Sequence, residues 1–340
     1  MIKISRKFRK PERTARLCRD GFRSGGPSGA VTHRRVLNIA LPIVLSNATV
    51  PILGAVDTAV IGQLGQAAPI GAVGLGAIIL VTIYWVFGFL RMGTTGLVAQ
   101  ARGAGDEAET GALLTRALMV AALAGGLMIA GQAAVFWAAF RVAPASAEVE
   151  ALARVYLSIR IWGAPAAIGG YAVTGWLIGM ERTRGVLALQ LVTNGLNVAL
   201  TVWFVLGLHW GIPGVATGTL IAEWSGLAFG LWLCRPAFGG AQWRDWGRVF
   251  DRAKLARMAR VNGDIMIRSV VLQASFTAFM FFGAGLGDVT LAANQVLLQF
   301  LEITAYALDG FAFAAEALVG QTLGQHARAD LRRAAILSSQ

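Results

Sequence analysis

The chain has 340 residues, of which 56% are hydrophobic and only 14% are charged, and its mean hydropathy is +0.61. A soluble domain lacks the interior to bury so much apolar surface, so this composition excludes a water-soluble globule and indicates a membrane protein. The formal net charge is +12, but residues 1–36 supply +9 of it, and this concentration in one tail argues against a nucleic-acid partner.

Residues 1–36 form a basic tail with eleven Lys and Arg and only two acidic residues, Glu12 and Asp20. The tail has no apolar core followed by a cleavage site, so it does not show the pattern of a secretory signal peptide. We expect it to be a disordered cytoplasmic tail. Contact with anionic lipid and an organellar address are the alternatives.

Eight apolar segments follow, each long enough to cross a bilayer, which takes about 20 helical residues. They cover residues 37–64, 67–99, 111–140, 155–180, 185–208, 212–234, 262–287 and 289–322. No alternating strand pattern recurs, and backbone groups in a bilayer must be bonded within their own segment. The sequence therefore predicts an all-α, polytopic membrane protein.

Basic residues in the loops predict the orientation of these helices. If the tail is cytoplasmic, the loops on its side hold the basic residues, and the opposite loops hold only Arg141 and Arg154. This asymmetry follows the positive-inside rule and predicts a multi-pass protein of the bacterial cytoplasmic membrane with its N-terminus inside. Cys18 and Cys234 then face the reducing side, so we expect no disulfide.

An internal repeat divides the chain. A shift of 222 residues pairs Tyr84 with Tyr306, and one residue of slip later LVAQ at 97–100 meets LVGQ at 318–321. A repeat of six helices would give two parallel bundles in the membrane. We expect the basic tail over 1–36, a complete first bundle over 37–234, a cytoplasmic linker over 235–261 and an incomplete second bundle over 262–340. On this view the chain is a fragment or a prematurely terminated form of a twelve-helix protein.

Two motifs resemble enzyme signatures without the context that enzymes need. GAVGLG at 71–76 fits a dinucleotide-binding pattern, but no strand precedes it, and small residues in a membrane helix favour close packing. GLGD at 285–288 resembles a motif of intramembrane aspartyl proteases, yet Asp288 is expected in a short turn with no second aspartate facing it. The three histidines lie near helix ends or in loops. We therefore expect no enzyme, no metal site and no cofactor.

Asp57 is the clearest candidate for a functional charge inside the membrane, where each charge is costly. It lies roughly 27 Å of helix rise from the start of the first apolar segment. Pro42 and Pro51 each remove a backbone hydrogen bond from the same helix and make it bendable. Burial favours the neutral carboxyl, so Asp57 could exchange a proton while its helix bends. A structural hydrogen bond to a neighbouring helix is the alternative.

Other charges lie within the apolar segments. Arg91 is well inside the second segment and could supply a counter-charge, or it could pair structurally. Arg160, Glu223 and Asp264 are expected near helix ends, where contact with lipid headgroups would satisfy them.

Four blocks of the sequence resemble the multidrug and toxic compound extrusion (MATE) family, and specifically its DinF-like branch. They are LPIVLSNATVPILGAVDTAVIGQLG, FGFLRMGTTGLVAQARG, YLSIRIWGAPA with GWLIGMERTR, and NGLNVALTVWFVLGLHWGIPGVATGTLIAEW, and the likeness covers residues 36–330. The resemblance implies two six-helix bundles that face each other across a cleft. It also implies export of organic cations or amphipathic toxic compounds, driven by entry of protons or sodium ions.

The resemblance also implies roles for particular residues. Proton-coupled members carry an aspartate 15 residues after a helix-bending proline, and Asp57 follows Pro42 at that spacing. A polar cluster on the fifth and sixth helices accompanies the aspartate; Asn197 and Thr219 match it, whereas Thr201 stands where those members have a second aspartate. Asn194, one turn before Asn197, faces the same side and is expected to extend the cluster.

These observations predict a secondary active exporter that works by alternating access. Its partners would be an amphipathic or cationic small molecule and membrane lipid, and we expect a monomer. A lipid-linked oligosaccharide flippase of the same superfamily is the alternative, but it would favour a more cationic cleft. A third hypothesis is that the truncated chain transports nothing, because alternating access needs two whole bundles.

Overall fold

The computed structural model describes residues 31–63, 67–143, 145–239, 241–284 and 288–339, and these contain helices and no strands. The first part of the chain holds α1 (His33–Gly62), α2 (Ala67–Val86), α3 (Phe89–Gly103), α4 (Glu107–Ala130), α5 (Gln132–Val142), α6 (Ala147–Arg160), η1 (Ile161–Gly163), α7 (Ala164–Gly179), α8 (Thr183–Val202), η2 (Trp203–Gly207) and α9 (Ile212–Leu233). The remainder holds η3 (Arg235–Phe238), η4 (Ala241–Arg244), α10 (Trp246–Val249), α11 (Arg252–Ala284), α12 (Asp288–Gly324) and α13 (Arg328–Ser339). The all-α prediction is confirmed; most of the predicted tail, residues 1–30, lies outside the described residues.

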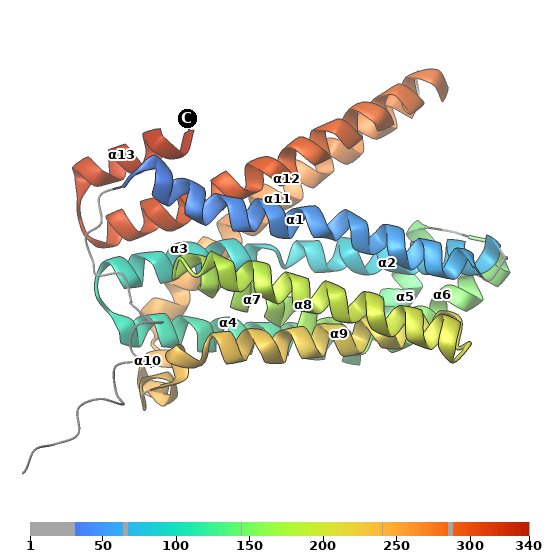
Figure 1. Cartoon of the computed structure of the whole chain (residues 1–340), viewed down its shortest axis with the longest axis horizontal. Coiled ribbons are helices and arrows are strands. Elements are labelled where there is room, and N and C mark those ends of the chain that lie inside the picture. Colours follow the sequence, from blue (N-terminus) through green and yellow to red (C-terminus); the bar gives the residue numbers. More distant parts are fainter. Residues whose placement is uncertain (1–30, 64–66, 144, 240, 285–287, 340) are drawn as a thin grey trace, which may run out of the picture. The chain divides into compact units, whose positions relative to one another are not determined.

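Helices α1 to α9 pack side by side as one bundle (Figure 1). Helix α1 packs on α8, α8 on α9, α4 on α7, and α2 on α6. Four of the described spans are long and apolar enough to cross a membrane, namely Ala67–Gly103, Glu107–Ala130, Ala147–Gly179 and Thr183–Gly207. Because helices bond their backbone groups internally, such a bundle can lie in hydrocarbon without unpaired backbone.

Several predicted helices are interrupted. A turn at Phe87 and Gly88 separates α2 from α3, and Gly131 separates α4 from α5. The span Ala147–Gly179 changes to a 3₁₀ turn at 161–163, just before Pro165, which cannot donate a backbone hydrogen bond. Glycine and proline are the usual causes of such breaks, and they divide long spans into segments that pack at different angles.

Helix α6 begins earlier than the sequence predicts. Ser146 caps it by accepting a hydrogen bond from the Val149 backbone N–H. Glu148 and Glu150 occupy its first turn, where negative charge interacts favourably with the helix dipole and stabilises the helix. The residues expected in an outside loop therefore include helical ones. Arg154 lies within α6 and pairs with Glu150 at 2.5 Å.

Helix α12 packs most closely on α3, and the two backbones approach each other at glycines. A Cβ atom added to Gly103 would lie 2.0 Å from the Gln321 carbonyl oxygen, and one added to Gly324 would lie 2.1 Å from that of Gln100. Only glycine permits such an approach. The segments that the predicted repeat pairs, 97–100 and 318–321, therefore meet each other at this contact.

We call the end of the bundle that carries residues 104–106, 180–182 and 234–251 the linker end. Here Glu181, held at a φ of 55°, binds Arg35 of α1 at 2.6 Å and Arg102 of α3 at 2.9 Å. Arg35 also donates to Gln321 of α12 at 2.5 Å. This clamp joins α1, α3 and α12 at the linker end.

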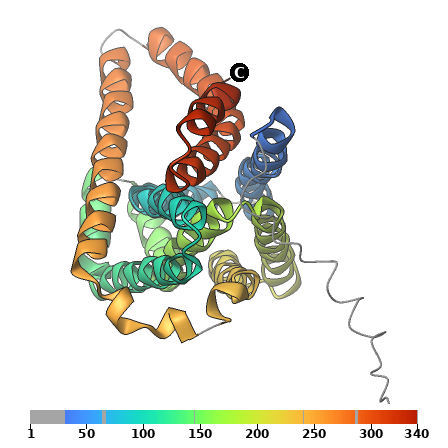
Figure 2. The same ribbon diagram turned by 90° about the vertical axis from the view of Figure 1, so that its left-hand side faces the viewer.

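The segment between α9 and α11 runs across the linker end (Figure 2). Arg116 of α4 is buried, and its guanidinium donates to the Val249 and Arg248 carbonyls at 2.8 and 2.6 Å and to Glu109 at 2.7 Å. Backbone donors at the start of α11, Lys254 first, hold the pKa of Asp251 below its usual range. Helix α11 begins at Arg252, so it takes in the last part of the predicted linker; the division into domains remains a prediction.

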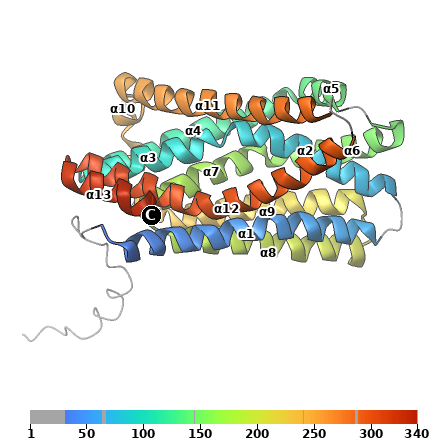
Figure 3. The ribbon, with the colours of Figure 1, turned by 90° about the horizontal axis from the view of Figure 1, so that it is seen from above.

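Helices α11 and α12 run lengthwise along the bundle (Figure 3), and their buried side chains, among those described, lie toward the linker end. Met258 and Phe313 are both 4% exposed, whereas Ile267 and Phe300, farther from that end, are 62% and 66% exposed. In Figure 1 the Asp288 end of α12 diverges from α1 and α2. The first bundle therefore touches the second-bundle helices at one end, and their apolar faces lie open toward the other.

We predict that two neighbouring glycines of α4 respond oppositely to alanine. A Cβ atom at Gly125 would lie 2.5 Å from the Cα atom of Pro165, whereas Gly126 has nothing within 4 Å. Gly125→Ala should lower the free energy of unfolding by about 1–3 kcal/mol because α4 and α7 must separate. Gly126→Ala, the matched control, should leave it unchanged or raise it by up to about 1 kcal/mol. Thermal unfolding in detergent measures both, and equal effects would contradict the packing.

Candidate functional site

Both predicted prolines lie inside α1, and the structure shows what replaces one lost backbone bond. Pro42 has no N–H to give to the carbonyl of Asn38, and that carbonyl accepts instead from the Thr183 hydroxyl of α8 at 3.2 Å. Of Pro51 only the backbone is described, and it is helical. Helix α1 is thus continuous, with a side-chain bond in place of a helical one.

Between the two prolines, α1 is held by neighbours on both sides. Asn194 of α8 donates to the Thr49 hydroxyl at 2.8 Å and accepts from Gln190 at 3.0 Å. Asn47 donates to the Tyr306 carbonyl of α12 at 3.3 Å. The structure therefore places Asn194 against the middle of α1, where a bend would strain or break its bond to Thr49.

Asp57 lies on the half-buried part of α1 beyond Pro51. Its carboxyl is beside the Thr201 hydroxyl of α8 and within electrostatic range of the Arg160 guanidinium. Neither Oδ1 of Asp57 nor Oγ1 of Thr201 has a hydrogen-bond partner among the described residues, and both atoms are buried. Unpaired buried oxygens are costly, so this arrangement favours a proton or a water molecule between the two groups.

Two other predicted polar residues, Asn197 and Thr219, lie in the same region of α8 and α9. Asn197 is 1% exposed and neither atom of its amide has a partner in the described part of the chain. Thr219 is also buried, and its hydroxyl donates to the Val215 carbonyl at 2.9 Å. Beside it Gly218 lies against Thr201, since a Cβ atom there would be 3.2 Å from Oγ1. The structure thus brings Asp57 and Thr201 together, with Asn197 one helical turn away.

A buried ion pair lies next to this cluster. Arg160 donates from both terminal nitrogens to Glu223 of α9, at 2.7 and 2.8 Å, and the two side chains are 8% and 17% exposed. The expectation that these two charges contact lipid headgroups near the ends of their spans is wrong, because they are paired in the interior. Arg160 is the last residue of α6, but the helical span continues through η1 into α7. Arg160 lies in the middle of the span Ala147–Gly179, and Glu223 lies in the middle of α9. Asp264, by contrast, is exposed on α11.

Two tyrosines complete the surroundings of the ion pair. Tyr156, one turn before Arg160 on α6, interacts with that guanidinium and with Glu223, and it packs on Gly76 of α2. Tyr84 of α2 is buried, faces Glu223 and Arg160, and its hydroxyl has no partner among the described residues. Helices α1, α2, α6, α8 and α9 therefore all contribute polar side chains to one buried region.

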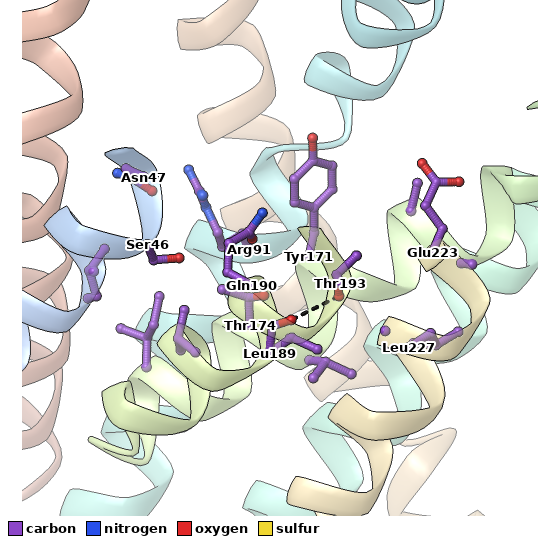
Figure 4. Close-up of a pocket in the computed structure, with 18 of the residues that line it drawn as sticks. Ser46, Asn47, Arg91, Tyr171, Thr174, Leu189, Gln190, Thr193, Glu223 and Leu227 are labelled. Carbon is purple, nitrogen blue, oxygen red and sulfur yellow. Dashed lines mark hydrogen bonds between the residues drawn. The ribbon is translucent and has the colours of Figure 1, made fainter. Parts of the chain in front are cut away.

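A cavity of about 190 Å³ lies on the other side of Glu223 (Figure 4). Its polar lining comes from α1, α3, α7, α8 and α9, and consists of Ser46, Asn47, Arg91, Tyr171, Thr174, Gln190, Thr193 and Glu223. Phe313 of α12 closes one side, with the Arg91 guanidinium 4.3 Å from its ring centroid. Apolar walls with a few convergent polar groups are typical of small-molecule sites.

Of the predicted site residues only Arg91 lines this cavity. Its guanidinium interacts with Tyr171 and with Asp309 and Glu316 of α12, and its Nε has no hydrogen-bond partner among the described residues. Asp57, Asn194, Asn197, Thr201 and Thr219 are not part of the lining, so their role as cavity wall remains a prediction. In the described part of the chain, no group of three His, Cys, Asp or Glu could hold a metal ion.

The sequence held a signal for the ion pair that the prediction did not use. Arg160 and Glu223 are opposite charges within two apolar segments, and Glu223 lies at the centre of its segment. Buried charges in membranes are usually paired. The cavity residues gave no comparable signal, because Asn47, Thr174 and Gln190 are ordinary polar residues on separate helices.

Comparisons with known proteins agree with this architecture. The family model MatE matches residues 42–203 and 265–338. DNA damage-inducible protein F of Escherichia coli is 40% identical over 299 residues, which cover 86% of this chain and 64% of the relative. Multidrug resistance protein PmpM of Pseudomonas aeruginosa is 27% identical over 324 residues, covering 89% of this chain and 64% of PmpM. The chain thus spans a little less than two thirds of these relatives.

Solved structures show the same fold. A MOP superfamily transporter from Pyrococcus furiosus superposes with a TM-score of 0.75 at 19% identity, over 93% of this chain and 69% of that one. A variant of the Vibrio cholerae MATE transporter VcmN gives a TM-score of 0.77 at 20% identity, over 90% and 69%. The family matches confirm the predicted resemblance, and they identify multi-pass transporters, not enzymes. The chain belongs to the MatE family of membrane transporters.

Proposed function

We propose that the protein to which this chain belongs is a secondary active exporter of organic cations or other amphipathic toxic compounds, coupled to entry of protons or sodium ions. The relatives named as multidrug resistance proteins support this substrate class. The observation that carries the proposal is the carboxyl of Asp57, which lies beside Thr201 on a helix that contains two prolines and whose buried Oδ1 has no hydrogen-bond partner among the described residues. A lipid-linked oligosaccharide flippase is not favoured, because the cavity charges Arg91 and Glu223 do not make a cationic cleft.

The proposed orientation follows from the basic residues. The linker end carries Arg35, Arg102, Arg116, Arg182, Arg248 and Lys254, so it faces the cytoplasm and the N-terminus lies inside. The clamp at Glu181 then closes the cytoplasmic side, while α11 and α12 diverge toward the outside. In this state a proton from outside could reach Asp57.

Proton binding would change the forces on α1. An ionised Asp57 is attracted by Arg160 and by the Thr201 hydroxyl, and neutralisation removes most of that attraction. Helix α1 can then move where Pro42 has already replaced a helical bond by the bond from Thr183. Movement at this point would alter Ser46 and Asn47 in the cavity wall and so expel the substrate. Loss of the proton to the cytoplasm would reset the helix.

We predict that Asp57→Asn abolishes proton-coupled export. The full chain would be reconstituted in vesicles loaded with a fluorescent lipophilic cation, and efflux would be followed after a pH jump. The amide keeps the shape of the carboxyl but cannot exchange a proton, so the pH-driven component of efflux should fall to the level of empty vesicles. Asp264→Asn, an exposed aspartate of α11, is the matched control and should retain efflux. Unchanged efflux by Asp57→Asn would refute proton coupling through this residue.

We also predict that Pro42→Ala slows export several-fold. Alanine at position 42 supplies the backbone N–H that the Asn38 carbonyl lacks as a helical donor. It therefore restores a helical bond, displaces the Thr183 hydroxyl and stiffens α1. Pro213→Ala is the control, because Pro213 occupies the first turn of α9, where its missing N–H costs no helical bond. Initial efflux rates in the same vesicles measure the effect. Equal rates for both variants would show that bending at Pro42 is not required.

A further inference from the structure

The ion pair between Arg160 and Glu223 lies inside the bundle, and the surrounding helices leave space for it. Both terminal nitrogens of Arg160 meet both carboxylate oxygens of Glu223, which is the strongest geometry such a pair can adopt. The fold makes room for it at Gly163, where a Cβ atom would lie 2.2 Å from Oε2 of Glu223. A buried pair of this kind is expensive to desolvate and does not by itself indicate added stability. Its position therefore suggests a role beyond packing.

Arg160 faces a second carboxyl from another helix. A guanidinium has five N–H donors, and Glu223 takes two of them. The buried Nε of Arg160 has no partner among the described residues, and Asp57 of α1 lies within electrostatic range. One cation thus acts on two carboxyls: that of Glu223 on α9, with both oxygens bonded to it, and that of Asp57 on α1, whose Oδ1 has no partner among the described residues.

The charge balance of these three groups depends on one proton. With Asp57 protonated, Arg160 and Glu223 neutralise each other and the group carries no net charge. With Asp57 ionised, the same region carries one net negative charge in an apolar interior, which is unfavourable unless the cation is shared between the two carboxylates. The structure shows the arrangement expected for the first state, with both terminal nitrogens of Arg160 bonded to Glu223.

We propose that Arg160 is a positioning residue shared by Glu223 and Asp57, and that Glu223 supplies the second carboxylate of the first bundle. Ionised Asp57 draws the guanidinium toward α1, and protonated Asp57 releases it to Glu223. Because Glu223 also lines the cavity, the proton on Asp57 is linked to the charge presented to the substrate. This inference rests on the proposed role of Asp57 as the proton-binding group.

Other charged and titratable groups surround these residues. Tyr84 of α2 and Tyr171 of α7 face Glu223, and Tyr156 of α6 interacts with Arg160, Asp57 and Glu223. Arg91 of α3 lines the same cavity as Glu223 and interacts with Asp309 and Glu316 of α12. Of all these groups, Arg160 is the cation that acts on Asp57, so exchange of its partners is the specific event to test.

The test follows the protonation of Asp57 directly. Infrared spectra of the full chain in lipid vesicles would be recorded across pH, and the carboxylic acid band lost in Asp57→Asn would be assigned to Asp57. In Glu223→Gln, Arg160 is free to serve Asp57 alone, so the midpoint of that band should move to lower pH by at least one unit, a tenfold change in proton affinity. The double variant Arg160→Gln with Glu223→Gln removes the cation as well and should move the midpoint above that of the unchanged protein.

Glu150→Gln is the matched control, because it breaks the exposed pair with Arg154 on the same helix α6 and should leave the midpoint unchanged. Circular dichroism would show whether Glu223→Gln folds. If it does not, the midpoint of the Asp57 band in the double variant tests the proposal, since that variant leaves neither Arg160 nor Glu223 as an unpaired buried charge. A midpoint that is the same in the unchanged protein and in these variants overturns the shared role of Arg160, even if Asp57 titrates and drives export. Failure of the proposed function is seen separately, as efflux that Asp57→Asn does not alter.

Discussion

The first bundle depends on how charge is neutralised in an interior that offers little water for the purpose. Arg160 and Glu223 meet this constraint through a two-point ion pair between α6 and α9. The carboxyl of Asp57 is less well compensated, because its Oδ1 has no bonding partner in the described part of the chain. Two of the three charges therefore neutralise each other, and the third stands outside that pair. The helices around them, including Gly163 and Gly218, are shaped to hold these groups close together.

Much of the fold follows from composition and periodicity. The apolar segments predict the helices because only a helix or a closed barrel satisfies its backbone in hydrocarbon. The ends of the helices were less predictable. The start of α6 depends on the Ser146 cap and two following glutamates, which resemble a polar loop when hydropathy alone is considered. That shift of the boundary explains why Arg160 was expected near a helix end and not in the middle of its span.

The candidate site could be predicted only in part, and the reason is physical. Asp57 and Pro42 could be found because a charge and a proline are each exceptional in a membrane helix. Asn194 was also found, but its bond to Thr49 depends on which faces of α1 and α8 meet, and sequence periodicity does not specify that. The cavity is harder still, since its lining combines ordinary polar residues from five helices with Phe313 from a sixth. The proton-coupling and substrate roles remain proposals.

The contact between α3 and α12 has a mechanical consequence. Glycines bring the two backbones together at Gly103 and Gly324, so main-chain atoms set the distance between the helices at these points. The contact lies near one end of a helix that runs from Asp288 to Gly324. It can therefore act as a fulcrum: a small rotation at the glycines becomes a large displacement at the distant end.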